Sequence, residues 1–442
     1  MLPTEIAGEA YLNSTSWDTL ERLTDIEDRM PGHTGEEEAA RVVGDALSNI
    51  GARNVEINQF DILGWWRKSS SIKLEEPHDT QFSADHELIS LPCSPSGTCS
   101  GDLVDVGYGL PRDLEETDID GKIVLASSLT PESHPRFIHR REKYHRAIAN
   151  GAAGFLFFNH KDGCLPATGT IGHRNELGDI PAAGVSKEVG SRLSRLCEKD
   201  NVSAELSIET HSEMTKSQNV EAVIGPETES EVLLTAHVDA HDINRGALDN
   251  GSGCALVVEV GRLLSHMEDD LDTRVRLITF GAEEIGLIGA THWVETHDMS
   301  NVKCIMNFDS PGRSRTPKFN TFEFEDLEDT IKEVSSELDV PNETFNEMWG
   351  HTDTWPFVKK GVPGVYAHTK ADEHGRGWGH THADTLDKID KRDLRDLAIF
   401  SAATVKNLTQ REQSVRRMSV DDVRNLTSEG NKEEMKYLGR SV

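Results

Sequence analysis

The chain has 442 residues, which exceeds the size of an ordinary single domain and predicts two domains. Its 77 acidic residues outnumber its 46 lysines and arginines and give a formal net charge of -31. This balance excludes nucleic acid as an expected partner, because phosphate binding requires basic patches.

The N-terminal stretch "MLPTEIAGEAYLNSTSW" has neither the basic start nor the apolar core of a signal peptide. No later run is long and apolar enough to span a bilayer, so we expect a cytoplasmic protein without a membrane partner. Amphipathic patterns predict helices in "SWDTLERLTDI" and "GEEEAARVVGDALSNIG", and "VEINQFDIL" predicts a strand.

The pattern changes near residue 88 to short strands and turns, with one helix in "REKYHRAIANGA". From Asn219 onward strands alternate with helices, which predicts a mixed, largely parallel sheet covered by helices on both faces. We therefore predict an α/β fold with an inserted, mostly-β domain. The predicted segments are 1–87 and 213–412 for the two parts of the α/β domain, 88–212 for the insertion, and 413–442 for a polar tail without an assigned role.

Residue types that bind metals follow several of the predicted strands. "EVLLTA" runs into His237, "RVRLITF" into Glu283 and Glu284, "VKCIMNF" into Asp309, and "GVPGVYA" into a loop with His368, His374, His380 and His382. In open α/β sheets, ligands bind beyond the carboxyl ends of the strands. Because imidazole nitrogens and carboxylate oxygens are typical zinc ligands, the sequence predicts a metal site at this edge of the sheet.

Each of these segments taken alone has a simpler explanation. Asp249, followed by Asn250 and Gly251, is typical of a tight turn. Glu283 and Glu284 suit the first turn of a helix, where the helix dipole stabilises acids. Their joint occurrence at matching strand ends favours the metal site, because the simpler explanations require several coincidences.

The segments resemble the zinc aminopeptidase family called M28, whose members have a paired-metal, or co-catalytic, site. The matching segments are "RMPGHTGEEEAARVVGDAL", "AHVDAHD", "GALDNGSG", "FGAEEIGLIGA", "NFDS" and "GHTHADTLDKID". The insertion resembles a protease-associated (PA) domain through "DIDGKIVLASS", "GAAGFLFFNH" and "IPAAGVS". The resemblance thus covers both parts of the α/β domain as well as the insertion.

The resemblance implies a ligand set for two zinc ions. His237 and Asp309 would bind one ion, Glu284 and His380 would bind the other, and Asp249 would bridge both. A carboxylate can bridge because it has two oxygens. Co²⁺ and Mn²⁺ accept the same ligand types, so the native metal stays open.

The resemblance also implies roles for residues around the ions. Glu283 would be the general base, and Asp239 would orient His237 from behind. His380 is preferred over His382 because the family pattern H-T-x-x-D-T begins there, and Asp384 would then support His380.

We therefore predict a di-zinc exopeptidase that removes N-terminal amino acids from peptides. A carboxypeptidase or dipeptidase of the same fold is one alternative, and a non-catalytic, receptor-like protein is another. A single-zinc glutaminyl cyclase is disfavoured by the complete bridging set. Many relatives carry Ser-Asp-His where this chain has Thr352, Asp353 and Thr354, which leaves the substrate contacts open, as are the side-chain preference and a homo-oligomeric state.

The polarity of cleavage depends on the charges that meet the end of the substrate. An aminopeptidase needs a carboxylate for the substrate ammonium, and a carboxypeptidase needs a cation for the terminal carboxylate. The loop "HTKADEHGRGWGHTHAD" is rich in acids and histidines, with Lys370 and Arg376 as its cations, while Arg140 and Arg141 lie in the insertion. This composition favours the aminopeptidase.

The acidic residues are spread along the whole chain, for example in "HMEDDLDTR" and "FEFEDLEDT". An ordinary acidic protein is one interpretation. We favour the other, a protein adapted to very high salt, in which carboxylates stay hydrated while screening removes their mutual repulsion.

Overall fold

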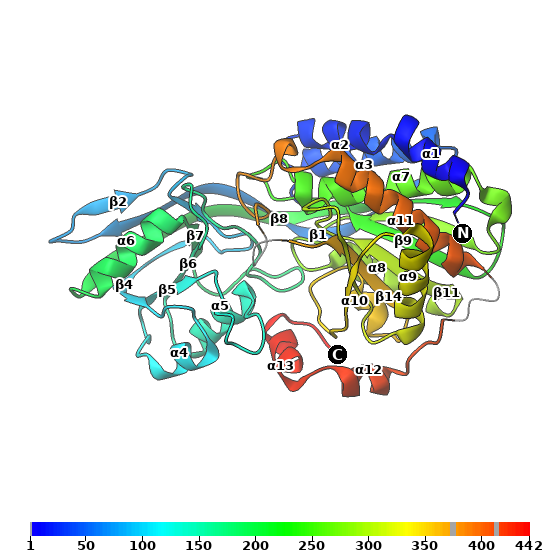
Figure 1. The fold of residues 1–442 in the computed structure, drawn as a ribbon. Helices are drawn as coiled ribbons and strands as arrows, with labels where there is room; N and C mark the ends of the chain where they lie inside the picture. The colour runs from blue at the N-terminus through cyan, green and yellow to red at the C-terminus, as the bar shows by residue number, and fades with distance from the viewer. Residues whose placement is uncertain (1, 372–376, 411–414) are drawn as a thin grey trace.

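The computed structural model describes residues 2–371, 377–410 and 415–442. One continuous sheet runs through the molecule, and helices cover both of its faces in the half that carries the predicted site (Figure 1). The predicted α/β fold is confirmed. Among the described residues, no helix combines the length and the apolar composition that a membrane span requires.

In the α/β half, described strands follow the spatial order β13-β12-β14-β11-β9-β10-β8, and the first residues of β1 (Arg53–Leu74) also pair with β8 there. Their bounds are β8 (Val202–Ile224), β9 (Glu231–His237), β10 (Arg274–Phe280), β11 (Val302–Phe308), β12 (Pro317–Asn320), β13 (Glu343–Phe345) and β14 (Gly364–Thr369). The central strands β10, β9, β11 and β14 are parallel, so their carboxyl ends meet at one edge of the sheet.

Two layers of helices bury the central strands. One layer contains α1 (Thr4–Leu12), α2 (Ser16–Asp25), α3 (Thr34–Asn49), α7 (Ser252–Ser265), α9 (Glu325–Leu338) and α11 (Lys391–Thr409), and the other contains α8 (Ile288–Thr296) and α10 (Trp355–Val358). Along β9, Val232 and Leu234 join the core under α7, whereas Leu233 packs with Trp293 and Phe357 on the opposite face. An apolar run such as "VLL" is expected for a strand buried on both faces.

The PA-like half continues the same sheet as β8-β4-β5-β6-β7-β3 and has two apolar cores of its own. Its elements are β3 (Leu88–Ser90), β4 (Gly97–Asp105), α4 (Pro111–Glu116), β5 (Ile123–Ser127), α5 (Arg140–Ala149), β6 (Gly154–Phe158), β7 (Ala182–Val185) and α6 (Lys187–Cys197). The long strands β1 (Arg53–Leu74) and β8 pair in antiparallel fashion and run from one half into the other, while β2 (Thr80–Phe82) pairs with the far end of β1. The predicted boundary at 212/213 therefore lies inside β8.

The C-terminal tail, which the sequence left without a role, bridges the two halves. It forms α12 (Val420–Leu426) and α13 (Glu429–Tyr437), and α13 lies beside α5 (Figure 1). Arg146 of α5 contacts Glu433 at 2.8 Å. On the other side, the Asn431 amide donates to the carbonyl of Met348 at 2.9 Å. The tail is thus part of the packed molecule.

Candidate metal centre

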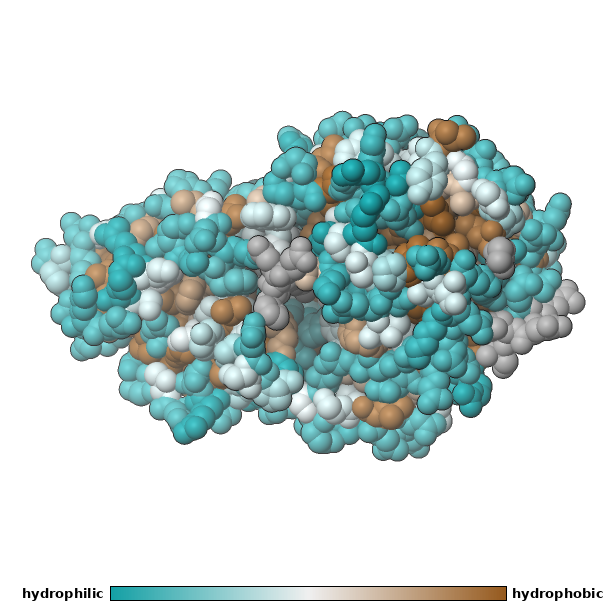
Figure 2. Space-filling view, viewed as in Figure 1, coloured by the Kyte–Doolittle hydropathy of each residue, from teal (hydrophilic) through white to brown (hydrophobic). Residues whose placement is uncertain are grey.

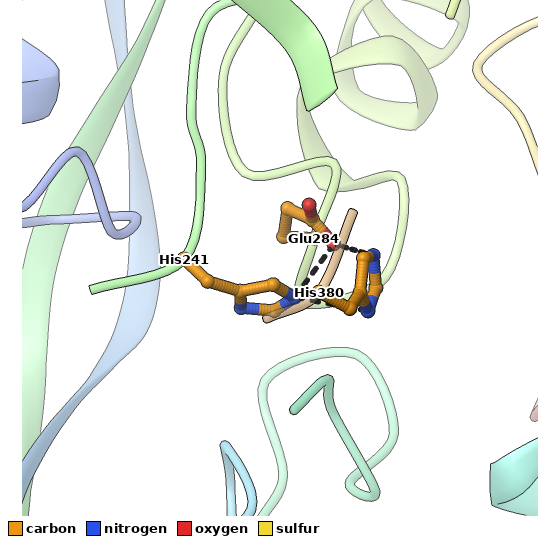
Figure 3. Close-up of side chains that lie close together, drawn as sticks. All are labelled: His241, Glu284 and His380. Atoms are coloured by element: carbon orange, nitrogen blue, oxygen red, sulfur yellow. Dashed lines mark hydrogen bonds and ion pairs between the residues drawn. The ribbon is translucent and has the colours of Figure 1, made fainter. Parts of the chain in front are cut away.

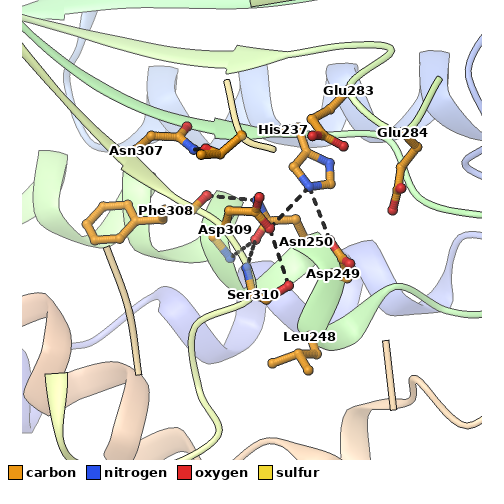
Figure 4. Close-up of polar contacts among 12 residues, drawn as sticks. His237, Leu248, Asp249, Asn250, Glu283, Glu284, Asn307, Phe308, Asp309 and Ser310 are labelled. Carbon is orange, nitrogen blue, oxygen red and sulfur yellow. Dashed lines mark hydrogen bonds and ion pairs between the residues drawn. The ribbon is translucent and has the colours of Figure 1, made fainter. Parts of the chain in front are cut away.

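The five predicted ligands come from five different segments that meet at the carboxyl edge of the sheet. His237 is the last residue of β9, and Asp309 directly follows β11. Glu284 lies in the loop after β10, His380 lies in the loop after β14, and Asp249 lies in the short turn Ala247–Gly251 before α7. Figure 4 shows His237 and Asp309 facing Asp249, with Glu284 nearby.

Asp249 lies between two groups of side chains, with one oxygen toward each. Its Oδ1 is 3.2 Å from His237 Nε2, which is itself 3.7 Å from Asp309 Oδ1. Its Oδ2 is 3.3 Å from His380 Nε2, which is 3.2 Å from Glu284 Oε2. This is the arrangement that a bridging carboxylate requires.

The donor set fits a pair of divalent ions of the zinc type. The side chains of His237, Asp249 and Glu284 are nearly fully buried, and, within the described part of the chain, His237 Nε2 and Glu284 Oε1 have no hydrogen-bond partner. Burying such atoms, and several carboxylates together, is costly unless a cation binds them. Burial and the neighbouring Glu284 would raise the pKa of Asp249, but the nearby imidazoles of His237 and His380 outweigh them and lower the pKa.

The contacts around the centre involve both of the predicted supporting acids. His237 Nδ1 lies 3.1 Å from the carbonyl oxygen of Asp239 and 3.5 Å from its Oδ1. The Asp239 carboxylate also accepts the backbone N–H groups of Glu283 and Glu284, at 3.1 and 3.0 Å. Asp384 accepts the backbone N–H groups of Leu248 and Asp249, at 2.7 and 3.0 Å, so it orders the bridging turn rather than the ring of His380.

Glu283 lies beside His237 with a half-buried side chain (Figure 4). Burial raises the pKa of its carboxyl well above the usual value, and the neighbouring acids Glu284, Asp353 and Asp309 raise it further. A carboxyl with an elevated pKa beside a metal site suits a group that must hold and release a proton.

The structure separates the two neighbouring histidines of "HTHAD". His380 points into the site, whereas His382 turns away and its Nδ1 lies 3.1 Å from the carbonyl oxygen of Ile243. His368 lines the adjacent cleft. His374 and Arg376 lie outside the described residues.

Two buried residues near the site were not predicted. His241 lies beside Glu284 and His380 (Figure 3), and its Nε2 is 3.0 Å from Glu284 Oε2 and 3.3 Å from His380 Nδ1. Glu36, at the start of α3, accepts the backbone N–H of Ala282 at 3.3 Å, and burial raises the pKa of its carboxyl to about 8. The spacing of "HVDAH" was a visible signal for His241. Glu36 resembled an ordinary acid of a helix start.

A cleft of about 630 Å³ adjoins the centre at Asp309. Its walls come from the PA-like half, the α/β half and the tail, for example Phe137, Tyr366 and Glu434. Figure 2 shows the hollow in the middle of this face, between the two halves of the molecule. The metal centre therefore opens into a space with room for part of a peptide.

An α/β sheet that carries paired histidine and carboxylate groups at the carboxyl ends of its strands, with a PA-like insertion, defines the class of metal-dependent exopeptidases. Residues 219–405 match Peptidase family M28, and residues 93–193 match the PA domain. The segment 219–405 therefore carries the family M28 pattern and the segment 93–193 that of a PA domain, in line with the resemblance seen in the sequence.

Similar proteins span nearly the whole chain. "Aminopeptidase YwaD" of Bacillus subtilis is 26% identical over 90% of this chain and 85% of its own length. "Carboxypeptidase Q" of Mus musculus is 24% identical over 86% of this chain and 82% of its own. The solved structure of BSAP, a zinc aminopeptidase from Bacillus subtilis, is 23% identical, covers 90% of this chain and 95% of its own, and has a TM-score of 0.70.

Proposed function

We propose that the protein is a zinc-dependent aminopeptidase that uses two metal ions to remove N-terminal residues from peptides. The position of Asp249, with one oxygen toward His237 and the other toward His380, is the observation that carries the proposal. The match of residues 219–405 to Peptidase family M28 and the relative named as an aminopeptidase support it.

The residues of the centre have distinct chemical tasks in this proposal. When bound, the zinc ions lower the pKa of a water molecule and polarise the scissile carbonyl. Glu283 accepts the proton of that water at its carboxylate and later gives it to the leaving amine. Asp239 fixes the backbone that carries Glu283 and Glu284, so that two adjacent glutamates keep different directions.

The contacts of the cations favour N-terminal polarity. Arg140 and Arg141, the basic candidates of the insertion, donate to the backbone carbonyls of Thr168 and Leu438. Lys370 contacts Glu343 at 2.6 Å. These three cations bind groups of the protein itself, so they are not directed at a substrate carboxylate.

The cleft itself contains charges of both signs. It is lined by the acids Asp309, Glu347 and Glu434, and by the cations Arg136, Arg313 and Lys318. Arg136 is bound in bidentate fashion by Glu142, at 2.7 and 2.8 Å. Since Asp309 is a proposed metal ligand, a substrate ammonium would meet Glu347 or Glu434 in this cleft, whereas a carboxylate would depend on Arg313 or Lys318.

Blocking one end of a peptide at a time tests the polarity. We expect N-acetylation of a short peptide to abolish its hydrolysis, and amidation of its C-terminus to leave the rate nearly unchanged. The rates are measured on matched peptides by chromatography of the released amino acid. Full activity on the acetylated peptide, with loss on the amidated one, would identify a carboxypeptidase instead.

The walls of the cleft predict a limit on substrate size. Because the PA domain, the α/β half and the tail all line the space, we propose that short peptides reach the centre and folded proteins do not. Incubation with a peptide of several residues and with a folded protein that has an accessible N-terminus measures this difference. Equal rates of release from both substrates would contradict the limit.

We further propose that the protein is adapted to high salt. Its net charge of -31 is carried mainly by exposed residues, and the visible face is largely hydrophilic (Figure 2). At molar salt the screening length falls to about 3 Å, which removes most of the repulsion among surface carboxylates. We expect the melting temperature to hold or rise from dilute buffer to molar salt. A steady fall across the salt series would indicate an ordinary acidic protein.

A further inference from the structure

A loop of the PA domain contacts one of the proposed metal ligands directly. The backbone N–H of Thr168 donates to the carbonyl of His380 at 2.9 Å. In return, His380 Nδ1 lies 3.2 Å from the carbonyl oxygen of Thr168. With a metal ion bound at Nε2, which faces Asp249 and Glu284, Nδ1 would carry the hydrogen and donate it to this carbonyl; His241 Nε2 lies 3.3 Å from the same Nδ1. A ligating histidine typically has such an acceptor, which fixes the orientation of its ring.

The loop is held by a buried arginine of the same domain. Arg140, at the start of α5, donates to the carbonyl of Thr168 at 3.1 Å and to that of Thr170 at 3.1 Å. Between these residues, Gly169 has a φ of +126°, and a Cβ there would lie 2.1 Å from Arg140 Nη2. Only glycine lets the backbone lie this close to the guanidinium. Arg140 and Thr168 are almost completely buried, so water does not compete for these bonds.

We propose that Arg140 is a positioning residue for the metal ion bound by His380, and that the PA domain is thereby coupled to metal binding. The chain of contacts runs from Arg140 to the carbonyl of Thr168 and from there to the ring of His380. By thermodynamic reciprocity, a metal ion that fixes His380 also stabilises the loop around Thr168. This inference rests on the proposed two-metal centre, but it concerns metal affinity rather than catalysis.

The test compares Arg140→Met with the matched variant Lys143→Met. Lys143 is also a buried residue of α5, and its Nζ donates to two backbone carbonyls, those of Ser127 at 2.7 Å and Leu129 at 3.1 Å, but neither belongs to the loop at His380. We expect both variants to lower the melting temperature of the metal-free protein. Only Arg140→Met should weaken the binding of one of the two zinc ions, by roughly 10- to 100-fold in a chelator competition.

Arg140→Lys should restore part of the affinity, because an ammonium can still donate to one carbonyl. Equal zinc affinities in Arg140→Met and Lys143→Met would overturn the inference. A wrong proposed function would give a different result, because the unaltered protein would then bind fewer than two zinc ions.

Hydrogen exchange on the unaltered protein gives a second test that does not depend on how the variants fold. The backbone N–H of Thr168 should exchange more slowly after zinc is added to the metal-free protein, together with its neighbours in residues 165–171. Exchange in α6, which lies on the other side of the PA domain, should stay the same and serves as the internal control. Unchanged exchange at Thr168 would contradict the coupling.

Discussion

Removal of the metal ions with a chelator is expected to abolish peptide hydrolysis, and the active protein should hold close to two metal equivalents per chain. The acids and imidazoles around Asp249 form two groups of the kind that bind metal ions, and in the proposed reaction the water is activated by those ions. Elemental analysis and rates before and after chelation measure both quantities. Metal-free protein with full activity would overturn the assignment of the centre.

A pair of histidine variants makes this prediction specific to the ligand set. His380→Asn should lose up to one metal equivalent and most of the activity, because His380 Nε2 faces both Asp249 and Glu284. His382→Asn is the control, since His382 lies two residues away and its ring faces the carbonyl of Ile243. We expect it to keep both ions. Loss of metal from His382→Asn alone would show that the two histidines have exchanged roles.

The part of the site that depends on strand ends could be predicted from the sequence. His237 ends β9 and Asp309 follows β11, and parallel strands deliver such residues to one edge of the sheet. The contacts of each supporting side chain were harder to predict from the sequence. Asp239 contacts His237 through its carbonyl and its carboxylate, but the bonds of that carboxylate to the backbone of the following glutamates could not be foreseen.

The contacts made by backbone atoms of distant segments could not be predicted at all. The carbonyl of Thr168 faces His380 across more than two hundred residues of chain, and a carbonyl has no residue type to reveal its role. Glu36 was not predicted for another reason: an acid at the start of a helix is already explained by its interaction with the helix dipole. The packing of the tail against both halves was not predicted, because α13 is largely polar and is held in part by ionic contacts such as that of Glu433 with Arg146.

Substitution of Glu283 by glutamine is expected to lower turnover by roughly 10²–10⁴, the usual effect of losing a general base. Glutamine keeps the size of the side chain but cannot accept a proton. Glu283 is not part of either group of ligand atoms, so Glu283→Gln should keep both metal ions. Elemental analysis and the turnover number on one peptide separate these two effects.

The same substitution at Glu284 should lower activity for a different reason, namely weaker metal binding. Glu284 Oε2 lies 3.2 Å from His380 Nε2, and the neutral amide oxygen of glutamine is a poorer zinc ligand than a carboxylate. Glu284→Gln should therefore lose up to one metal equivalent, and excess zinc should restore part of its rate, whereas zinc should not rescue Glu283→Gln.

If both residues merely stabilised the turn before α8, either change would cost about 0.3–1 kcal/mol of stability and leave turnover nearly normal. Rescue of Glu283→Gln by zinc would instead show that the two adjacent glutamates have exchanged roles. The comparison separates the two roles because Asp239 accepts a hydrogen bond from the backbone of each residue, while only the Glu284 side chain reaches the ligand atoms.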